Sequence, residues 1–167
     1  MAKTTKEKAA NQSETMGDVT YPKAVKDNKL SYMIFQVAKT HRGLAAELLR
    51  SLGIYPGQEI LLMHLWDQDG QTQSELIAKI GIDASTVTKM VQRLEAEGHI
   101  TRTQSTIDRR AFIVKLTPSG QKLKPKVEKV WSDLNEATIK HLSSSEQNQL
   151  IELLQKAFAS LRETGAE

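Results

Sequence analysis

Cysteine is absent from this chain of 167 residues. Its absence excludes a disulfide scaffold, cysteine-based zinc sites, thiol catalysis and thiol redox sensing. Long apolar runs are also missing, because the longest, such as 60–63 and 111–114, fall far short of the roughly 18–20 residues of a membrane span. No apolar segment follows the basic start Met1–Lys8, so no secretory signal is expected. These absences predict a soluble, cytoplasmic protein with no membrane partner.

The chain has no large excess of positive or negative charge: it has 23 lysines and arginines and 20 aspartates and glutamates, which gives a net charge of +3. This balance alone is weak evidence for a polyanionic partner, so the positions of the charges matter more. Residues 1–28 contain no Leu, Ile, Phe or Trp and have too little apolar surface to offset the entropy of ordering. We expect a flexible arm there, whose lysines are either solvated or in contact with a partner.

Apolar residues recur at three- and four-residue spacing in six segments, which predicts six helices. The first helix is expected at about 29–52, and Pro56 suits the first turn of the second. Residues 72–75 match a capping box that opens a short third helix. Gly81 permits a sharp turn into a fourth helix, which runs to Glu97 and which Asp83 or Ser85 can cap.

After the fourth helix the apolar period changes from 3.6 to 2. Two strand-like runs, His99–Thr103 and Phe112–Leu116, predict a β-hairpin. A fifth helix is expected at about 118–142, kinked or loosely wound near Pro125. A second capping box at Ser143 opens a sixth helix at about 145–163.

Two short helices joined at a glycine turn and followed by a hairpin are typical of a winged helix-turn-helix. The sequence therefore predicts a mostly α fold of six helices with a β-hairpin wing. The expected parts are a domain at 29–163, a DNA-binding lobe at about 56–116, the helix-turn-helix at about 73–97 and the wing at about 99–116.

The fourth helix has a polar face suited to DNA. At about 100° per residue, its apolar residues from Val87 to Leu94 share one sector, and no carboxylate occurs on the other side before Glu95. Lysine and arginine bind guanine acceptors, glutamine pairs with adenine, and hydroxyls contact base edges or phosphates. The alternative is an ordinary amphipathic surface helix. The candidate DNA-binding residues here are Ser85, Thr86, Thr88, Lys89, Gln92 and Arg93.

The expected hairpin tip carries Asp108, Arg109 and Arg110. Burial of paired arginines would cost hydration energy, which argues against a core role. Their planar guanidinium groups suit phosphates or the negative potential of a narrow minor groove. Since Asp108 would repel phosphate, we expect it to pair with an arginine and hold the loop rigid. The alternative is a plain exposed salt bridge at a turn.

Four stretches match a single pattern: SELIAKIGIDASTVTKMVQRLEAEGHI from Ser74, the D-x-R element at 108–110, LTPSG from Leu116 and LSSSEQNQLIELL from Leu142. With them, residues 30–163 resemble the MarR-type transcription regulators. The resemblance implies an obligate homodimer in which the first, fifth and sixth helices form the dimerisation layer. It also implies that the fourth helix enters the major groove of double-stranded DNA and that Arg110 reaches the minor groove. Tyr55 departs from the family pattern, in which a small capping residue commonly precedes the proline.

The apolar faces of the first and sixth helices give a separate reason to expect a homodimer. One small winged domain cannot cover two long apolar faces, and patches of that size are seldom left exposed in a monomer. A two-fold dimer would present two recognition helices to a pseudo-palindromic site, with half-sites about one helical turn apart.

The resemblance also implies a small aromatic or lipophilic effector, bound between the dimerisation helices and the lobe. Phe35, His41, Trp66 and Trp131 are the candidate lining residues, and core packing is the alternative role for each. No metal and no cofactor are expected, because the histidines lack zinc-ligand spacing and no phosphate-binding glycine loop is present. No serine has the context of a nucleophile elbow, so the chain is not expected to be an enzyme.

These observations predict a sequence-specific, DNA-binding transcription regulator. The regulator is expected to repress promoters whose pseudo-palindromic operators it covers, and to be released by the effector. The alternative is an architectural or protein-interaction module that uses the same winged fold with little sequence specificity.

Overall fold

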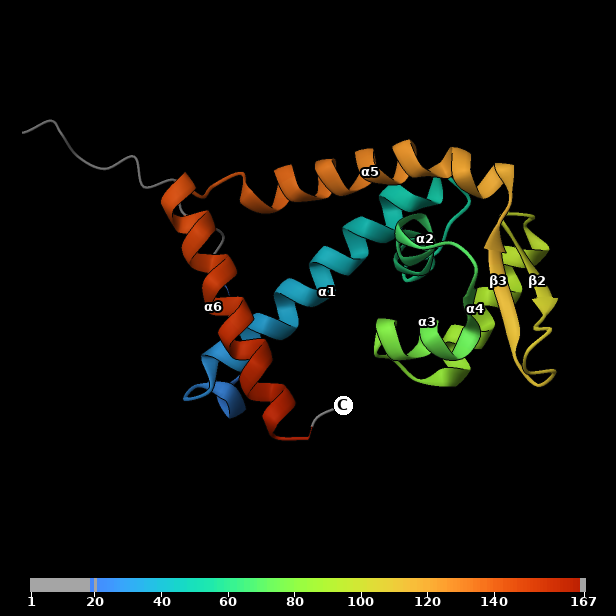
Figure 1. Ribbon diagram of the computed structural model, residues 1–167. Coiled ribbons are helices and arrows are strands. Elements are labelled where there is room, and N and C mark those ends of the chain that lie inside the picture. The colour runs from blue at the N-terminus through green and yellow to red at the C-terminus, as the bar shows by residue number, and fades with distance from the viewer. Residues whose placement is uncertain (1–18, 20, 166–167) are drawn as a thin grey trace, which may run out of the picture. The chain divides into compact units, whose positions relative to one another are not determined.

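The computed structural model describes residues 19 and 21–165 (Figure 1). Most of the predicted N-terminal arm, residues 1–28, therefore lies outside the described residues. The chain divides into two compact units, with the boundary between Ala38 and Lys39.

The first unit contains a short 3₁₀ turn, Lys23–Val25, and the start of helix α1, which spans Lys29–Arg50 and continues into the second unit. The ring of Tyr32 lies between those of Tyr21 and Phe35, with centroid distances of 5.7 and 6.4 Å.

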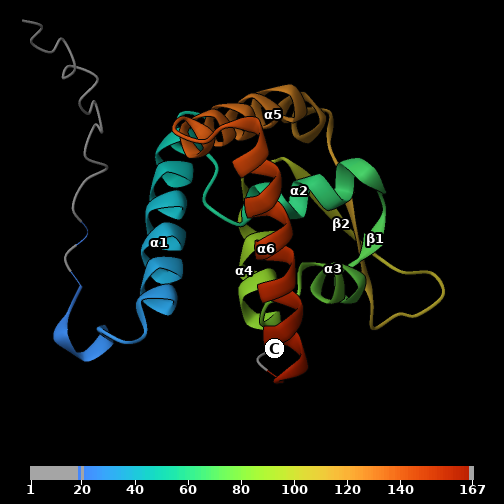
Figure 2. The same ribbon diagram turned by 90° about the vertical axis from the view of Figure 1, so that its left-hand side faces the viewer.

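The second unit contains the rest of α1, five further helices and a three-stranded antiparallel sheet in the order β1-β3-β2. The hairpin of β2 and β3 lies next to α4 (Figure 1), and the loop between its strands projects away from the sheet (Figure 2). The helix-turn-helix followed by a hairpin confirms the predicted fold class. The bounds are α2 Gln58–Asp67, β1 Gln71–Thr72, α3 Gln73–Ile80, α4 Ala84–Ala96, β2 Ile100–Gln104, β3 Phe112–Leu116, α5 Pro118–Ile139 and α6 Ser144–Glu163.

The short strand β1 was not predicted from the sequence. It pairs with β3 through Gln71 opposite Val114 and Thr72 opposite Ile113. Two residues are too few to show an alternating pattern, so only the pairing with β3 identifies the strand. The buried side-chain amide of Gln71 also donates hydrogen bonds to carbonyls at the end of α2, which joins the sheet to that helix.

One core holds the lobe together. The side chains that α2, α3, α4, α5 and the sheet contribute to it are almost completely inaccessible to water, and their burial supplies the main stabilising free energy. This core fixes the rotation of α4 about its own axis. Its members include Leu61, Leu62, Leu65, Leu76, Val87, Val91, Leu94, Ile100, Val114, Leu123 and Val127.

The local signals at the helix ends explain these bounds. Thr72 and Glu75 form the predicted capping box at the start of α3, and Gly81 ends that helix with φ of 68°. A side chain at this φ would be strained, so glycine allows the tight turn into α4. Ser143 and Glu146 form the second predicted capping box, at the start of α6.

The predicted place of Pro56 in the first turn of α2 is wrong, because the helix begins at Gln58. Gly57 precedes it with φ of 100°, which is not helical. The side chain of Gln58 accepts a hydrogen bond from the N–H of Tyr55 at 2.8 Å, and that of Glu59 accepts one from Gly57 at 2.7 Å. These two bonds hold the loop against the start of the helix, while no side chain of the described residues caps the free N–H groups of the first turn of α2.

Helix α5 continues through Pro125 to Ile139, so the predicted loose winding of its first turns is wrong. Leu123 and Val127, on either side of the proline, are buried in the core and hold the helix in place. A Cβ at Gly120 would collide with the carbonyl oxygen of His99. Glycine therefore lets the start of α5 lie directly against the sheet.

Candidate nucleic-acid interface

The polar residues of α4 form a surface that we call the recognition strip: Ser85, Thr86, Thr88, Lys89, Gln92 and Arg93. Val87, Val91 and Leu94 are buried on the other side of the helix, as the apolar sector predicted. Ser85, Lys89, Gln92 and Arg93 are exposed, whereas Thr86 and Thr88 are half-buried. The structure therefore brings all six predicted residues onto one helix, with four of them open to a partner.

Asp83 caps the start of α4. Its Oδ1 accepts a hydrogen bond from the Ser85 hydroxyl at 2.6 Å and one from the Thr86 N–H at 2.8 Å. These bonds lower the pKa of Asp83 from its usual 3.8 to about 2, and the bond from Ser85 has the largest effect. The carboxylate therefore stays charged at neutral pH and stabilises the N-terminus of the recognition helix.

Replacing Asp83 by alanine is expected to lower the melting temperature by a few degrees, while Asp83→Asn keeps an acceptor for the cap. The unfolded carboxyl group binds its proton near pH 3.8 and the folded one only near pH 2. The stabilisation by its charged form is thus complete above pH 3.8 and is lost as the pH falls through 2. Thermal unfolding between pH 5 and pH 2 should show a steeper loss of stability in the wild type than in Asp83→Asn, because only the wild type loses the contribution of Asp83; parallel profiles would contradict it.

The hydroxyl protons of Ser85 and Thr88 are already donated inside the protein. Ser85 donates to Asp83, and Thr88 donates to the carbonyl of Ala84 at 2.7 Å. Phosphate oxygens in DNA only accept hydrogen bonds, so neither hydroxyl suits a phosphate in this arrangement. Their lone pairs suit the amino groups of adenine and cytosine.

Gln73 is a neighbour of the recognition strip that the sequence did not reveal. This first residue of α3 donates a hydrogen bond from Nε2 to the Thr88 hydroxyl at 2.8 Å. The bond leaves Thr88 with one lone pair and ties the two helices of the helix-turn-helix together. The one sequence feature that could have suggested this contact is the position of the glutamine directly after the capping residue Thr72. In a helix-turn-helix, the start of α3 lies close to α4.

The guanidinium of Arg93 lies over the ring of Tyr55, with 5.3 Å between Cζ and the ring centroid. Tyr55 belongs to the loop between α1 and α2, far from α4 in sequence. The contact places an exposed aromatic residue at the edge of the recognition strip.

The wing loop is organised by Ser105, whose hydroxyl accepts hydrogen bonds from the N–H groups of Ile107 and Asp108 at 3.2 and 3.3 Å. Asp108 in turn accepts a bond from the Arg110 N–H at 2.9 Å. The expected ion pair between Asp108 and an arginine side chain is therefore wrong; the carboxylate holds the loop through the backbone. The reason is the short reach within a turn, which favours a backbone donor two residues away.

Arg109 and Arg110 are both exposed at the tip of the wing. The carbonyl of Arg109 accepts a hydrogen bond from the Gln104 side chain at 2.6 Å, which leaves its guanidinium unaffected. Within residues 19 and 21–165, the two ion pairs are those of Glu95 with Arg102 and of Lys129 with Asp133. Both wing arginines can therefore offer their guanidinium groups to an anionic partner.

Glu95 and Arg102 join the recognition helix to the base of the wing. Arg102 Nη2 lies 2.5 Å from Glu95 Oε2, and its guanidinium also lies over the ring of Phe112. The hydrogen bond from Arg102 lowers the pKa of Glu95, so its carboxylate remains charged. The wing and α4 are thus held at one angle, although neither residue stands out in the sequence.

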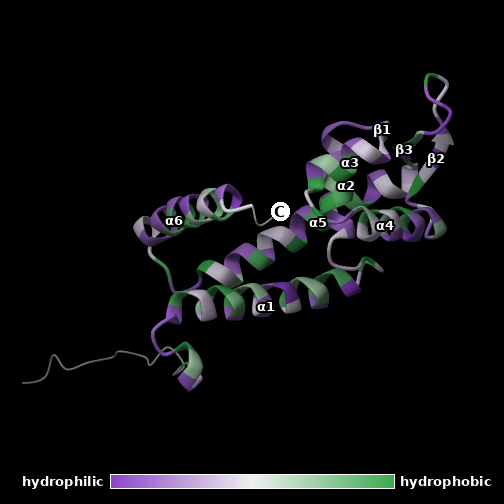
Figure 3. Ribbon diagram, turned by 90° about the horizontal axis from the view of Figure 1, so that it is seen from below, coloured by the Kyte–Doolittle hydropathy of each residue, from purple (hydrophilic) through white to green (hydrophobic). Residues whose placement is uncertain are grey.

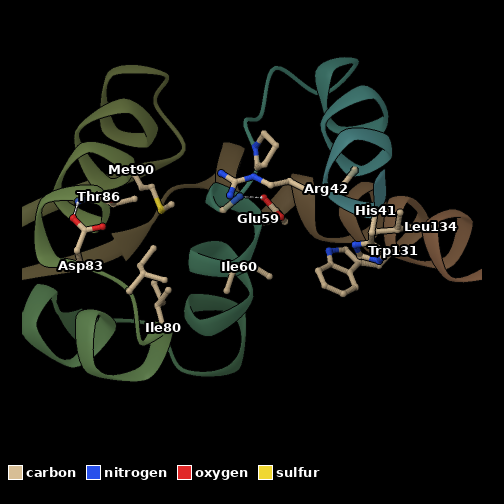
Figure 4. A pocket seen from close by; sticks show the side chains of 14 residues that line it. His41, Arg42, Glu59, Ile60, Ile80, Asp83, Thr86, Met90, Trp131 and Leu134 are labelled. Atoms are coloured by element: carbon tan, nitrogen blue, oxygen red, sulfur yellow. Dashed lines mark hydrogen bonds between the residues drawn. The ribbon is translucent and has the colours of Figure 1, made fainter. Parts of the chain in front are cut away.

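A cavity of about 540 Å³ lies behind α4, on the side of that helix that faces α1, α2 and α5 (Figure 4). His41 and Trp131, two of the four predicted effector residues, line it, and so do Thr86 and Met90 of α4. Arg42 and the buried Glu59 supply charge at its wall; burial raises the pKa of Glu59, and backbone hydrogen bonds and Arg42 oppose that rise.

The other two predicted effector residues do not line this cavity. Trp66 packs against the core and donates a hydrogen bond from Nε1 to the carbonyl of Gly120 at 3.2 Å. Phe35 belongs to the first unit, where its ring neighbours Tyr32. Within the described part of the chain, no group of three or more histidines and carboxylates is arranged to hold a metal ion.

Comparison with known proteins places this geometry in a family. A model described as "MarR family" matches residues 54–112, which contain α2, α3, α4 and β2. A putative transcriptional regulatory protein for the hcr operon of Thauera aromatica is 30% identical over 125 residues, which cover 75% of each chain. The chain belongs to the MarR family. The organic hydroperoxide resistance transcriptional regulator of Bacillus subtilis, another relative in this family, is 30% identical over 100 residues, 60% of this chain and 68% of that one.

Solved structures of MarR-family proteins agree with this assignment. A mutant MarR from E. coli complexed with operator DNA has a TM-score of 0.74 and 27% identity, covering 82% of this chain and 99% of that one. A MarR transcriptional regulator from Methanosarcina mazei Go1 has a TM-score of 0.73 and 26% identity, covering 81% and 98%. The curated relatives are named as transcriptional regulators, a non-enzymatic role, which confirms the prediction that this chain is not an enzyme. Among the helices in residues 19 and 21–165, none has both the length and the apolar character of a membrane span.

Proposed function

We propose that this MarR-family chain is a homodimeric repressor in the cytoplasm that binds pseudo-palindromic operators overlapping promoters. The observation that carries the proposal is the recognition strip. Four of its six residues are exposed, no carboxylate occurs from Ser85 to Arg93, and the core fixes the rotation of its helix. Cations, amide and hydroxyls in this arrangement suit the edges of base pairs. The operator complex of the E. coli relative supports the same role here.

The wing supports a second contact with the duplex. Arg110 is exposed, and its backbone is fixed by the Asp108 carboxylate, so its guanidinium can reach from a rigid loop into the minor groove. Arg109 is exposed beside it and suits a backbone phosphate.

The apolar side chains of α6 support the homodimer. None of its residues is buried, and hydrophobic and polar segments alternate along the helix (Figure 3). An apolar face this long, left in water, is stabilised by a second copy of the chain. The proposed dimerisation helices are those expected at about 29–52, 118–142 and 145–163. Helix α1 also exposes apolar side chains, those of Leu30, Ile34, Phe35 and Val37. The exposed apolar residues of α6 are Leu150, Ile151, Leu153, Leu154, Phe158 and Leu161.

The cavity behind α4 supports regulation by a small aromatic or lipophilic effector. Trp131 offers an aromatic wall, and Arg42 and His41 suit an acid group on the ligand. Since Thr86 and Met90 of α4 line the same space, an occupant would shift the recognition helix and change the spacing of the two recognition helices in the dimer.

Titration with phenolic acids tests this regulation. The change in tryptophan fluorescence should saturate as the ligand fills the cavity, and the bound ligand should release DNA.

Selection of bound duplexes from a random pool tests the DNA-binding proposal. We expect a pseudo-palindrome whose half-sites lie about one helical turn apart. Salt titration should then show much tighter binding to the selected duplex than to random DNA, and Arg110→Ala should lower the affinity for it. Equal affinity for both duplexes would overturn sequence-specific regulation and favour an architectural role.

A further inference from the structure

Arg93, at the edge of the recognition strip, is paired with Tyr55, a contact that base reading by the strip does not explain. Tyr55 is 57% exposed although it is aromatic, and its ring lies 5.3 Å from the guanidinium carbon of Arg93. Neither of the two ion pairs within the described residues involves Arg93. A cation without a carboxylate partner, resting on an aromatic face, can bind an anion from outside.

The backbone on both sides of Tyr55 is anchored, so its ring has a defined place. Ile54, directly before it, is 2% exposed and lies in the core. The Tyr55 N–H donates a hydrogen bond to the Gln58 side chain at 2.8 Å, and the Tyr55 carbonyl accepts one from the Gln58 N–H at 3.0 Å. Gln58 is itself buried. The ring is therefore held out at the surface by a fixed loop.

The same loop packs along α4 at a second point. Gly57 lies against the terminal methyl group of Met90, and its φ of 100° favours glycine at this turn. Met90 and Arg93 are three residues apart and lie on neighbouring positions of one helix face. The loop therefore contacts α4 through Gly57 and Met90, and through Tyr55 and Arg93.

We propose that Tyr55 and Arg93 together form a contact for a DNA backbone phosphate at the edge of the major groove. The ring covers one face of the guanidinium and restricts its rotation, while the N–H groups at the edge of the guanidinium stay available for phosphate oxygens. Tyr55 is thus a positioning residue for Arg93 and acts only through it. This inference rests on the proposed DNA-binding function.

A double-mutant cycle on the selected operator tests the pair. Arg93→Ala is expected to weaken binding and to reduce the slope of log affinity against log salt by about 0.9, as for one lost phosphate contact. Tyr55→Ala should weaken binding by roughly two- to fivefold, the effect of an exposed cation–π contact. In the Arg93→Ala background, Tyr55→Ala should have no further effect, and Tyr55→Phe should keep most of the wild-type affinity.

The outcomes separate this inference from the proposed function. A wild-type protein that prefers no duplex would refute the function itself. If the wild type binds but the losses from Tyr55→Ala and Arg93→Ala multiply, the two residues act independently and the pair is refuted. Arg93→Lys provides a control, because it keeps the charge without the planar group and should lose the coupling to Tyr55. Equal melting temperatures for all variants would show that the loop remains folded.

Discussion

A Lys89→Glu variant is expected to bind the selected operator about 100-fold more weakly than the wild type. Lys89 is exposed at the centre of the recognition strip, so the change removes a cation that suits guanine acceptors. The substitution also introduces a carboxylate into the recognition strip, which has none in the wild type. Contacts between this carboxylate and the negatively charged DNA cost several kcal/mol. Fluorescence anisotropy with a labelled operator at one fixed salt concentration measures the loss.

Lys126→Glu is the matched control for this experiment. Lys126 is exposed on α5, outside the recognition strip, and the substitution changes the net charge by the same amount. Because α5 is a proposed dimerisation helix, sedimentation velocity should first show that this variant stays dimeric. The loss should then be much smaller, due only to the altered long-range field, and should shrink as salt is added. Similar losses for the two variants would mean that net charge, rather than the strip on α4, determines binding.

Leu154→Asp in α6 is expected to convert the proposed dimer into monomers. Leu154 is 53% exposed in a single chain and lies within the apolar face of α6, so in a dimer its aspartate would be buried without a partner. The full operator should then bind roughly 100-fold more weakly, because two linked half-site contacts become independent. Binding to an isolated half-site should change little. Sedimentation velocity and gel-shift assays measure these two effects.

Ala159→Asp controls for the added charge on the same helix. Ala159 is exposed and lies about 140° around α6 from Leu154, on the side away from the apolar residues, so the carboxylate should remain in water. This variant should stay dimeric and bind the operator normally. A Leu154→Asp protein that sediments as a dimer would show that α6 does not hold the two copies together.

Much of the fold could be predicted because its determinants are local. The capping boxes at Thr72 and Ser143 each lie within four residues, and Gly81 ends α3 through its own backbone conformation. The apolar sector of α4 follows from helical periodicity, so the polar strip could be predicted with it. The start of α2 was misplaced because Gly57 adopts a positive φ that a proline signal does not reveal.

Partners distant in sequence were beyond such reasoning. Thr88 and Gln73 are 15 residues apart, and Tyr55 and Arg93 come from different elements. Asp108 was expected to pair with an arginine side chain, but the geometry of the wing turned it toward a backbone N–H. Each of these contacts depends on how two elements meet.

The order of residues along this chain is sufficient to specify its helices, most of their ends and the face of α4 that remains polar, because capping and periodicity act over a few neighbouring residues. The tertiary structure alone decided which hydroxyl protons are already donated, which arginine lies over a tyrosine, and where a cavity opens behind α4. Those outcomes depend on packing between elements, which brings side chains within hydrogen-bond distance regardless of their separation in sequence.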